Sequence, residues 1–391
     1  MNASFDVVIV GGGVTGAAVG YGLAKRGVKT CLVDAVPTFS RASRANMGLI
    51  WCQSKALGCP QFVRWGFASS RAYGKLAAEL KELSGIDTGY APTGGIIPCL
   101  GEAELEARAK FIEKLRAETE DGTYPASVLS RRELEGMLPK VPFGPEVSGG
   151  IWSDMDGYVD PLHLMFAFRK SFVRLGGTLF AGERVSEVKP SGKGYTVVCG
   201  GRTLECGKAV LAAGLGVRKL AAQLGTDIPV FPNKSQVMLL ERIPADVLPI
   251  PLLGIARTFG GTVMIGAAHE NMGMDRRLTP EVLAANAQWA VRVWPELERK
   301  RILRFWTGLR VWPKDAYPIY DRIPGHENAF VFAMHSAVSL AAILEQALPD
   351  YVMGKPLPPD GAIFGLSRFA GGGSGFQGSA ASSPHAEAPN K

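Results

Sequence analysis

The chain has 391 residues, of which 47% are hydrophobic, so it can bury more than one small core. This length predicts about two domains. Lysine and arginine total 43 against 36 acidic residues, and the net charge is +7 at pH 7. The basic residues are scattered and do not alternate with aromatic ones, which argues against nucleic-acid binding and for a solvated surface with some attraction for anionic substrates or an acidic partner.

The cysteines and the termini narrow the class of protein further. No C-x-x-C pair occurs, so we expect reduced, mostly structural thiols, no metal centre and a cytoplasmic location. The first strand begins without a basic segment before it, and no apolar run approaches the ~20 residues that cross a bilayer. Neither a signal peptide nor a transmembrane segment is expected, whereas peripheral membrane contact stays open. The cysteines are Cys31, Cys52, Cys59, Cys99, Cys199 and Cys206.

The N-terminal stretch carries the strongest single motif. Phe5–Val10 is a short apolar run, typical of a buried parallel strand. Gly11, Gly13 and Gly16 follow as G-x-G-x-x-G at the start of a helical pattern. Glycines at this spacing let the backbone turn tightly and approach a pyrophosphate, and the helix N-terminus offers free N–H groups to the phosphates.

A second strand and an acidic residue complete this motif. Thr30–Val33 is a β-branched apolar run, and Asp34 ends it, where a carboxylate can accept hydrogen bonds from a ribose. Strand, glycine turn, helix, strand and acid together predict dinucleotide binding, and an ordinary βα turn is the alternative.

The rest of the chain alternates between helical and strand periodicity. A loop of small residues follows Asp34, and longer, more isolated strands between residues 229 and 310 favour an antiparallel sheet. The last regular part is a strand, a small-residue turn and a helix, at residues 329–354. No internal repeat is present. Helices are predicted at Phe62–Leu83, Glu102–Glu118, Pro161–Leu175 and Pro280–Val293, with another opened by a Ser130–Glu133 capping box, and strands at Thr93–Leu100 and Ala209–Ala212.

Five ordered segments carry a family resemblance over about residues 4–355. They are GGGVTG with Asp34; S-x-x-N-x-G with Ser43, Asn46 and Gly48; DGYVDP at 156–161; VLAAGLG at 210–216; and WTGLR at 306–310 with HSAVSLA at 335–341. With them the chain resembles the FAD-dependent amino-acid oxidase and dehydrogenase family, the group of D-amino-acid, glycine and sarcosine oxidases. DGYVDP and HSAVSLA are most similar to the catalytic subunits of opine oxidases and D-hydroxyproline dehydrogenases.

The resemblance implies an α/β fold with two interleaved domains. A Rossmann-like FAD-binding domain is expected to contain residues 1–60, 145–225 and 311–356. An antiparallel-sheet α+β substrate domain is expected to contain residues 61–144 and 226–310. Residues 357–391 are predicted to be a C-terminal tail that is largely disordered, because from Gly371 the sequence lacks core-forming residues.

FAD is the cofactor that the resemblance implies. The loop with Ser43 and Asn46 would pass along the flavin and diphosphate, or be a surface turn, and the Val185 backbone would hold the adenine. The helix after His335 would stabilise negative charge on the flavin, although relatives have glycines where this chain has Met334 and Ala337. The residues assigned to FAD are Gly11, Gly12, Gly13, Val14, Thr15, Gly16, Asp34, Ser43, Asn46, Gly48, Val185, Ala213, Gly214, Ser336, Ala337, Val338, Ser339 and Leu340.

Arg310 and His335 are the candidate catalytic residues. In WTGLR the resemblance implies that Arg310 binds the substrate carboxylate, a pairing that suits a planar guanidinium, and a surface salt bridge is the alternative. Lys314 and Asp315 are expected to be solvated. Trp312, Tyr317 and Tyr320 are candidate pocket walls or core residues, and His163, His269 and His326 are expected to be structural.

The predicted function is FAD-dependent oxidative deamination of a small amino or imino acid: an opine, D-hydroxyproline or a D-amino acid. Hydride would pass from the substrate α-carbon to flavin N5, and the imine would hydrolyse to an oxo acid. Met264 occupies the place of a lysine that favours oxygen in sarcosine oxidases, which favours a dehydrogenase with an electron-accepting FAD/iron–sulfur partner subunit, a quinone or a dye. The alternatives are an oxygen-using glycine or D-amino-acid oxidase and a non-catalytic flavin-binding scaffold. An NAD-dependent dehydrogenase is a weaker alternative, because the C-terminal segments have no role in that fold.

Overall fold

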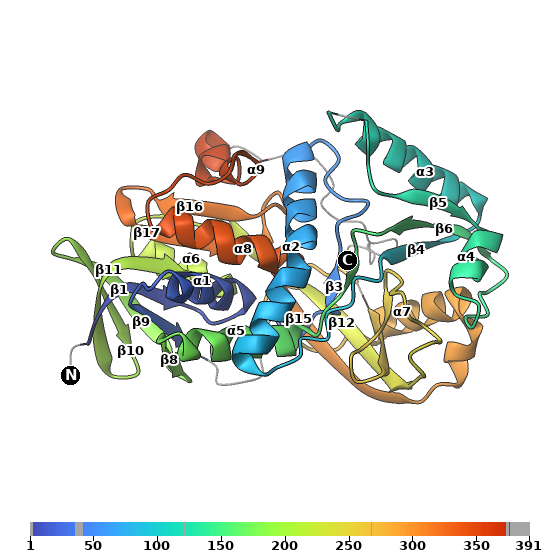
Figure 1. The fold of residues 1–391 in the computed structure, drawn as a ribbon, viewed down its shortest axis with the longest axis horizontal. Helices are drawn as coiled ribbons and strands as arrows, with labels where there is room; N and C mark the ends of the chain where they lie inside the picture. Colours follow the sequence, from blue (N-terminus) through green and yellow to red (C-terminus); the bar gives the residue numbers. More distant parts are fainter. Residues whose placement is uncertain (1–2, 36–41, 121, 267, 373–374, 376–391) are drawn as a thin grey trace.

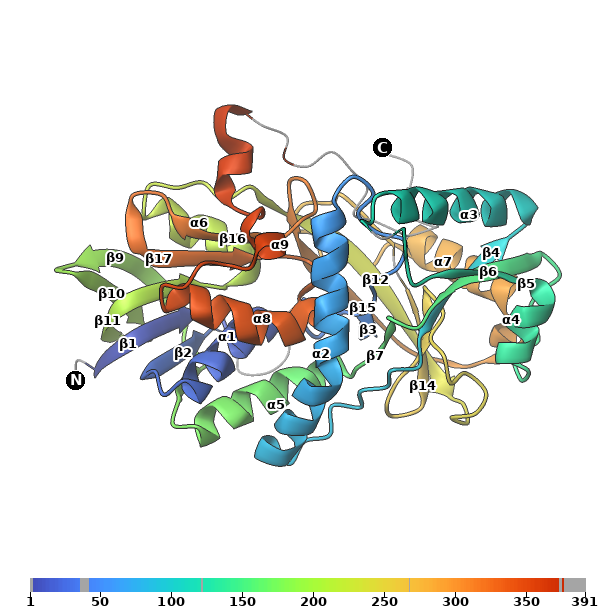
Figure 2. The ribbon, with the colours of Figure 1, turned by 45° about the horizontal axis from the view of Figure 1, so that its top comes forward.

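The computed structural model describes residues 3–35, 42–120, 122–266, 268–372 and 375. One lobe contains a large, mostly parallel sheet and the other is built on antiparallel strands, with the long helix α2 (Pro60–Ser84) standing between them (Figure 1). Figure 2 shows the same arrangement after rotation, with α2 crossing beside α5 and α8. None of the helices within the described ranges has the length and apolar character that a bilayer crossing requires.

The large sheet has the strand order β16-β17-β11-β1-β2-β8, and β10 and β9 continue from β11. β1 is parallel to both β2 and β11, so the G-x-G-x-x-G turn lies at the carboxyl end of a central strand. The strands are β1 (Ala3–Val10), β2 (Thr30–Asp34), β8 (Thr178–Ala181), β9 (Val185–Ser191), β10 (Gly194–Cys199), β11 (Arg202–Leu211), β16 (Ile319–Ile323) and β17 (His326–Ala333).

Both faces of β1 are buried from Val7 to Val10, which explains why this part of the strand is apolar throughout. Val7 and Ile9 pack in the cluster that also contains the buried residues of α1, α5 and α8. Val8 and Val10 pack in the opposite cluster, with residues of β10 and α6. The helices of this lobe are α1 (Val14–Lys25), α5 (Pro161–Arg174), α6 (Val217–Ala222), α8 (Ala337–Val352) and the short η1 (Gly214–Gly216).

The second lobe joins two antiparallel sheets, β13-β14-β12-β15 and β4-β6-β5. An isolated bridge between Ile96 and Leu252 links them. The long pair β12–β15 places Arg310 opposite Asn233. Its elements are β4 (Gly95–Leu100), β5 (Ser127–Ser130), β6 (Val147–Ser153), β12 (Val230–Arg242), β13 (Ile255–Arg257), β14 (Thr262–Gly266), β15 (Ile302–Pro313), α3 (Glu102–Ala117), α4 (Arg131–Met137), α7 (Pro280–Val293) and η2 (Pro295–Arg299).

The helices agree closely with the sequence predictions. α7 has the predicted bounds, and α2, α3 and α5 each lie within two residues of theirs. The capping box is present: the Glu133 N–H donates to Ser130 Oγ, and the Ser130 N–H donates to the Glu133 carboxylate. The predicted domain boundaries stay a prediction, and two elements make contacts across them. β6 pairs with β4 and β5, and α2 packs on α5 and α8.

The predicted disordered tail begins too early, because residues 357–372 are folded. α9 (Pro359–Ala362) and η3 (Leu366–Gly372) follow α8, and Phe364 is fully buried against Phe62 and Tyr317. Arg368 pairs with Asp315 at 2.8 Å, so the prediction of a solvated Asp315 is wrong. Residues 373–374 and 376–391 lie outside the described part of the chain.

Candidate active site

A cavity of about 1270 Å³ is lined by residues of both lobes. Its walls include the β1–α1 turn, the two-stranded ladder of β3 (Leu49–Ile50) and β7 (Gly157–Tyr158), and the strands β12 and β15. Of the predicted site residues it is lined by Gly11, Gly13, Val14, Thr15, Asp34, Ser43, Asn46, Val185, Ala213, Gly214, Arg310, His335, Ser336, Ala337, Val338 and Ser339, whereas Gly12, Gly16, Gly48 and Leu340 lie behind its surface.

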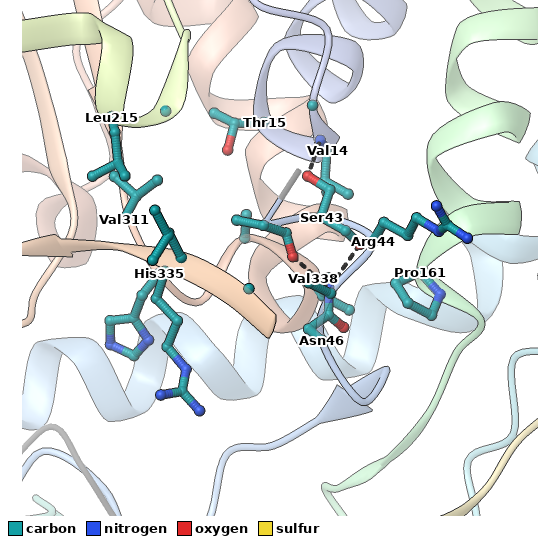
Figure 3. A pocket seen from close by; sticks show the side chains of 18 of the residues that line it. Val14, Thr15, Ser43, Arg44, Asn46, Pro161, Leu215, Val311, His335 and Val338 are labelled. Atoms are coloured by element: carbon teal, nitrogen blue, oxygen red, sulfur yellow. Dashed lines mark hydrogen bonds between the residues drawn. The ribbon is translucent and has the colours of Figure 1, made fainter. Parts of the chain in front are cut away.

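The β1–α1 turn requires glycine for two physical reasons. Gly11 has φ +106°, and a Cβ there would lie 2.5 Å from the Ala212 carbonyl oxygen. A Cβ on Gly16 would lie 1.8 Å from the Gly11 carbonyl oxygen. The turn therefore keeps the backbone close to the cavity, and α1 begins there with its N–H groups directed at the same space. Ser43 accepts a hydrogen bond from the Val14 N–H at 3.1 Å, as Figure 3 shows.

Asp34 is held by a cation that the sequence analysis did not identify. Its Oδ2 accepts hydrogen bonds from the Gly12 N–H at 2.8 Å and from Arg169 Nη2. Arg169 also donates to the Gly12 carbonyl oxygen, at 2.8 Å from Nε and 2.6 Å from Nη2. The sole sequence signal for Arg169 is its place on the apolar face of the helix at 161–175. The ribose role of Asp34 stays a prediction.

The S-x-x-N-x-G loop is shaped mainly by its own hydrogen bonds. Asn46 Nδ2 donates to the Ser43 carbonyl oxygen at 2.8 Å, and Asn46 Oδ1 accepts from the Gly48 N–H at 2.8 Å. Gly48 has φ +77°, and a Cβ there would lie 2.1 Å from the Val159 carbonyl oxygen. Gly48 thus lets the loop approach the DGYVDP segment, while Ser43 and Asn46 line the cavity.

His335 lies at the start of α8 with one unsatisfied nitrogen. Its ring stacks on Trp312, with centroids 4.5 Å apart and planes at 20°. Nδ1 lies 3.2 Å from Ser336 Oγ, and the buried Nε2 has no hydrogen-bond partner among the described residues. Burial lowers the pKa of His335 well below its usual value, and the charges of Lys55 and Arg310 lower it further. The ring is therefore neutral and can still exchange a hydrogen bond with a ligand.

The guanidinium of Arg310 is fixed by neutral groups. Nη1 donates to Asn233 Oδ1 at 3.0 Å and to the Ala268 carbonyl oxygen at 2.8 Å, and Nη2 donates to Ser235 Oγ at 2.9 Å. Burial lowers its pKa to about 10, so it keeps its charge at neutral pH. No carboxylate among the described residues pairs with it, and Nε and the second Nη2 hydrogen have no partner there.

Two further residues near Arg310 were not predicted to belong to the site. His269 was expected to be structural, but it lines the cavity with Nδ1 3.1 Å from Arg310 Nη1. Burial, with Arg310 and then Lys55, lowers the pKa of His269 to about 3. Lys55 also lines the cavity, and nothing in its sequence context indicated this. The long-range fold brings these residues together.

The aromatic candidates divide between cavity and core. Trp312 lines the cavity, and so does Met264. Tyr317 and Tyr320 are buried in the core beside Phe364, and neither lines this cavity. His163 and His326 lie outside the cavity, where their Nδ1 atoms lie 2.9 Å from the Asp87 carbonyl oxygen and 3.1 Å from Tyr195 Oη.

These residues fit FAD. The glycine turn at β1–α1 can approach a diphosphate without a side chain, and α1 begins at this turn with its positive dipole end. The cavity continues from this turn to the start of α8, where His335 Nε2 is buried and unsatisfied. Ser43, Asn46, Val185, Ala213 and Gly214 line the space between these two regions.

The fold and the cavity define a Rossmann-type oxidoreductase whose glycine turn at β1–α1 suits a dinucleotide. Residues 6–344 match the family described as FAD dependent oxidoreductase, and the chain belongs to this family. Its cofactor is FAD, as the sequence predicted.

The similar proteins span nearly the whole chain. An opine oxidase subunit from Agrobacterium tumefaciens (strain Ach5) is 33% identical over 365 residues, covering 93% of this chain and 97% of the relative. Glycine oxidase from Geobacillus kaustophilus is 27% identical over 378 residues, covering 95% and 99%. The crystal structure of a glycine oxidase from Geobacillus kaustophilus has a TM-score of 0.86 and covers 94% of this chain and 99% of that chain. The predicted family, α/β fold and enzyme class are therefore confirmed.

Proposed function

We propose that this chain oxidises a small amino or imino acid whose carboxylate binds Arg310. The observation that carries the proposal is that Arg310 lines the cavity, neutral groups hold its guanidinium, and on the Nε–Nη2 edge the Nε–H and one Nη2 hydrogen have no partner among the described residues. This edge presents two parallel N–H donors, the geometry that a carboxylate accepts in bidentate fashion. Relatives that act on opines and on glycine support the same substrate class.

The charges around Arg310 also suit the amine of such a substrate. Arg310 and Lys55 are cations, and His269 and His335 are neutral because burial and these two charges lower their pKa values. Positive surroundings disfavour a protonated amine, so a bound substrate loses its amine proton more readily. The neutral nitrogen then has a lone pair that can support loss of hydride from the adjacent carbon.

The reaction follows from this binding geometry. When bound, FAD accepts the hydride from the substrate α-carbon. Loss of hydride from the neutral amine leaves a protonated imine, which water hydrolyses to an oxo acid and a protonated amine. Arg310 positions the substrate through its acid group, and the N-terminal end of α8 with His335 favours negative charge at that end of the cavity.

The experiment is an anaerobic screen of amino and imino acids with the purified, FAD-loaded chain. Bleaching of the visible flavin absorbance by at least one of them is the expected result. Arg310→Met should raise the substrate concentration needed for bleaching by about 100-fold or more while FAD stays bound. Lys300→Met, a change at a surface ion pair with Glu241, is the control. If no amino or imino acid bleaches the wild type, the chain is a flavin-binding scaffold and the proposal fails.

A second subunit is the electron acceptor that we infer for this chain. Two kinds of relative carry the word subunit in their names: the opine oxidase proteins, and hydrogen cyanide synthase subunit HcnC, which in Pseudomonas aeruginosa is 28% identical. Met264 lines the cavity where the sequence resemblance places an oxygen-favouring lysine in sarcosine oxidases. The isolated chain should therefore reduce an artificial dye faster than oxygen. Rapid peroxide release by the chain alone would favour the oxidase alternative.

A further inference from the structure

Lys55 directs a second positive charge at the cavity that contains Arg310. It lines the cavity wall on the turn between β3 and α2, and its Nζ donates to the Trp51 carbonyl oxygen at 3.1 Å. Across the described ranges no carboxylate lies within ion-pair distance of this ammonium. An ammonium has three donors, so the two that remain are available to a ligand.

The turn that carries Lys55 is held from behind by a buried carboxylate. Asp156 Oδ1 accepts from the Cys52 N–H at 2.5 Å and from the Gln53 N–H at 3.2 Å. Asp156 Oδ2 accepts from Gln53 Nε2 at 2.7 Å. These bonds tie residues 52 and 53 to the DGYVDP segment, and the Ser54 N–H donates to Tyr124 Oη at 3.0 Å. The turn is therefore fixed on the side away from the cavity.

The backbone on both sides of Lys55 is in an unusual conformation. Ser54 has φ 53° and Ala56 has φ 63°, the left-handed region that non-glycine residues rarely occupy. Within the described residues one other non-glycine residue, Ala316, has positive φ. Such conformations persist where the surrounding structure imposes them, and they concentrate at functional sites. Here the two residues flank the one side chain of the turn that carries a charge into the cavity.

Lys55 and Arg310 line the same cavity, and neither has a carboxylate of the described residues within ion-pair distance. Burial lowers the pKa of Lys55 and the positive charge of Arg310 lowers it further, whereas Cys52 and Asp156 act in the opposite direction. A single substrate carboxylate on Arg310 would leave Lys55 without a counter-charge in a partly desolvated space. A second carboxylate on the same ligand would supply that charge.

We propose that Lys55 binds a second carboxylate of the substrate, so that this enzyme prefers secondary amines that join two carboxylic acids. The assignment rests on the proposed function, in which Arg310 holds the first carboxylate. It makes Lys55 a specificity-determining residue: a substrate with one acid uses Arg310 alone, and a substrate with two spans both cations.

The test compares two substrates that differ in the second acid group. Iminodiacetate has two carboxylates and N-methylglycine has one, and both have a secondary amine. In Lys55→Met the KM for iminodiacetate should rise about tenfold or more with little change in kcat, while the KM for N-methylglycine changes less than about twofold. The surface variant Lys75→Met should change neither value.

A binding measurement separates recognition from turnover. Calorimetry should show that wild-type protein binds succinate at least about tenfold more tightly than its monomethyl ester, and that Lys55→Met or Lys55→Gln abolishes the difference. The wild-type comparison stands even if the variants fail to fold.

Three results would overturn the assignment. The first is an equal rise of KM for both substrates in Lys55→Met, and the second is unchanged kinetics with both. The third is a slower reaction with oxygen without a change of substrate selectivity. Each would mean that Lys55 has another role. The proposed function is tested separately, because it fails only when the wild type oxidises neither these substrates nor any other amino or imino acid.

Discussion

His269 Nδ1 lies 3.1 Å from Arg310 Nη1, and the same nitrogen lies 3.0 Å from Asn233 Oδ1. Burial disfavours a second proton on this imidazole, and the adjacent guanidinium adds to the penalty because two cations would then be in contact. The pKa of His269 is therefore lowered to about 3. A neutral His269 leaves the charge of Arg310 unopposed here, in the cavity that Lys55 also lines.

Stability should depend on pH through His269. Between its folded pKa of about 3 and its ordinary value of 6.5, the unfolded chain holds a proton that the folded chain lacks, so stability falls as the pH is lowered. The contribution is at most about 1.4 kcal/mol per pH unit. Urea denaturation at pH 7 and pH 5 should show a smaller loss for His269→Gln than for the wild type. His326→Gln, outside the cavity, should lose as much as the wild type, and identical losses in all three would refute the prediction.

Ser235→Ala should loosen the carboxylate site without removing its charge. Arg310 Nη2 loses the partner that holds it at 2.9 Å, so the KM of a carboxylate substrate should rise about threefold to tenfold. FAD content should stay the same. Steady-state kinetics beside Ser148→Ala, a serine of β6 that bonds to Cys99, checks the prediction. A KM equal to that of the wild type would mean that Ser235 does not position Arg310.

Arg169→Met should destabilise the cofactor end of the cavity. It removes the cation from the fully buried Asp34 and two donors from the Gly12 carbonyl oxygen. Breaking a buried ion pair costs about 3–5 kcal/mol, and FAD should dissociate during dialysis. Arg292→Met breaks a half-exposed pair with Glu146 and should cost far less, because solvent screens that pair. Urea denaturation and flavin absorbance measure both effects, and equal costs would contradict this account.

Gly48→Ala and Gly27→Ala separate backbone strain from crowding. Both glycines have positive φ, at +77° and +72°, so alanine has the same conformational penalty of about 1 kcal/mol at each. At Gly27 a Cβ meets nothing within 4 Å, whereas at Gly48 it would lie 2.1 Å from the Val159 carbonyl oxygen. Gly48→Ala should therefore be less stable by about a further 2 kcal/mol in thermal or urea unfolding. Matching stabilities would show that the loop can move away from Val159.

The sequence predicted the parts of the fold that depend on neighbouring residues. The glycine turn after β1, the burial of both faces of that strand and the bounds of α7 follow from local spacing. It also placed Arg310 and His335 in one site through a family resemblance, and both line one cavity. Their roles stay predictions until the variants are measured.

Contacts between distant segments explain what the sequence did not predict. Arg169 reaches Asp34 from α5, and Lys55 enters the cavity because Asp156, about 100 residues later in the chain, fixes its turn. The sequence indicated a solvated Asp315, but Arg368 of the C-terminal segment forms an ion pair with it in the structure. Each case depends on a partner whose position is set by packing, and no periodicity in the chain encodes that position.

The most direct test of the carboxylate site is a titration of the FAD-loaded chain with propionate, followed by the visible flavin spectrum. Propionate has the acid group but no amine, so it can bind without being oxidised. The account predicts a saturable spectral shift for the wild type, which Arg310→Met abolishes while retaining its flavin. A shift of the same amplitude and affinity in Arg310→Met would contradict it.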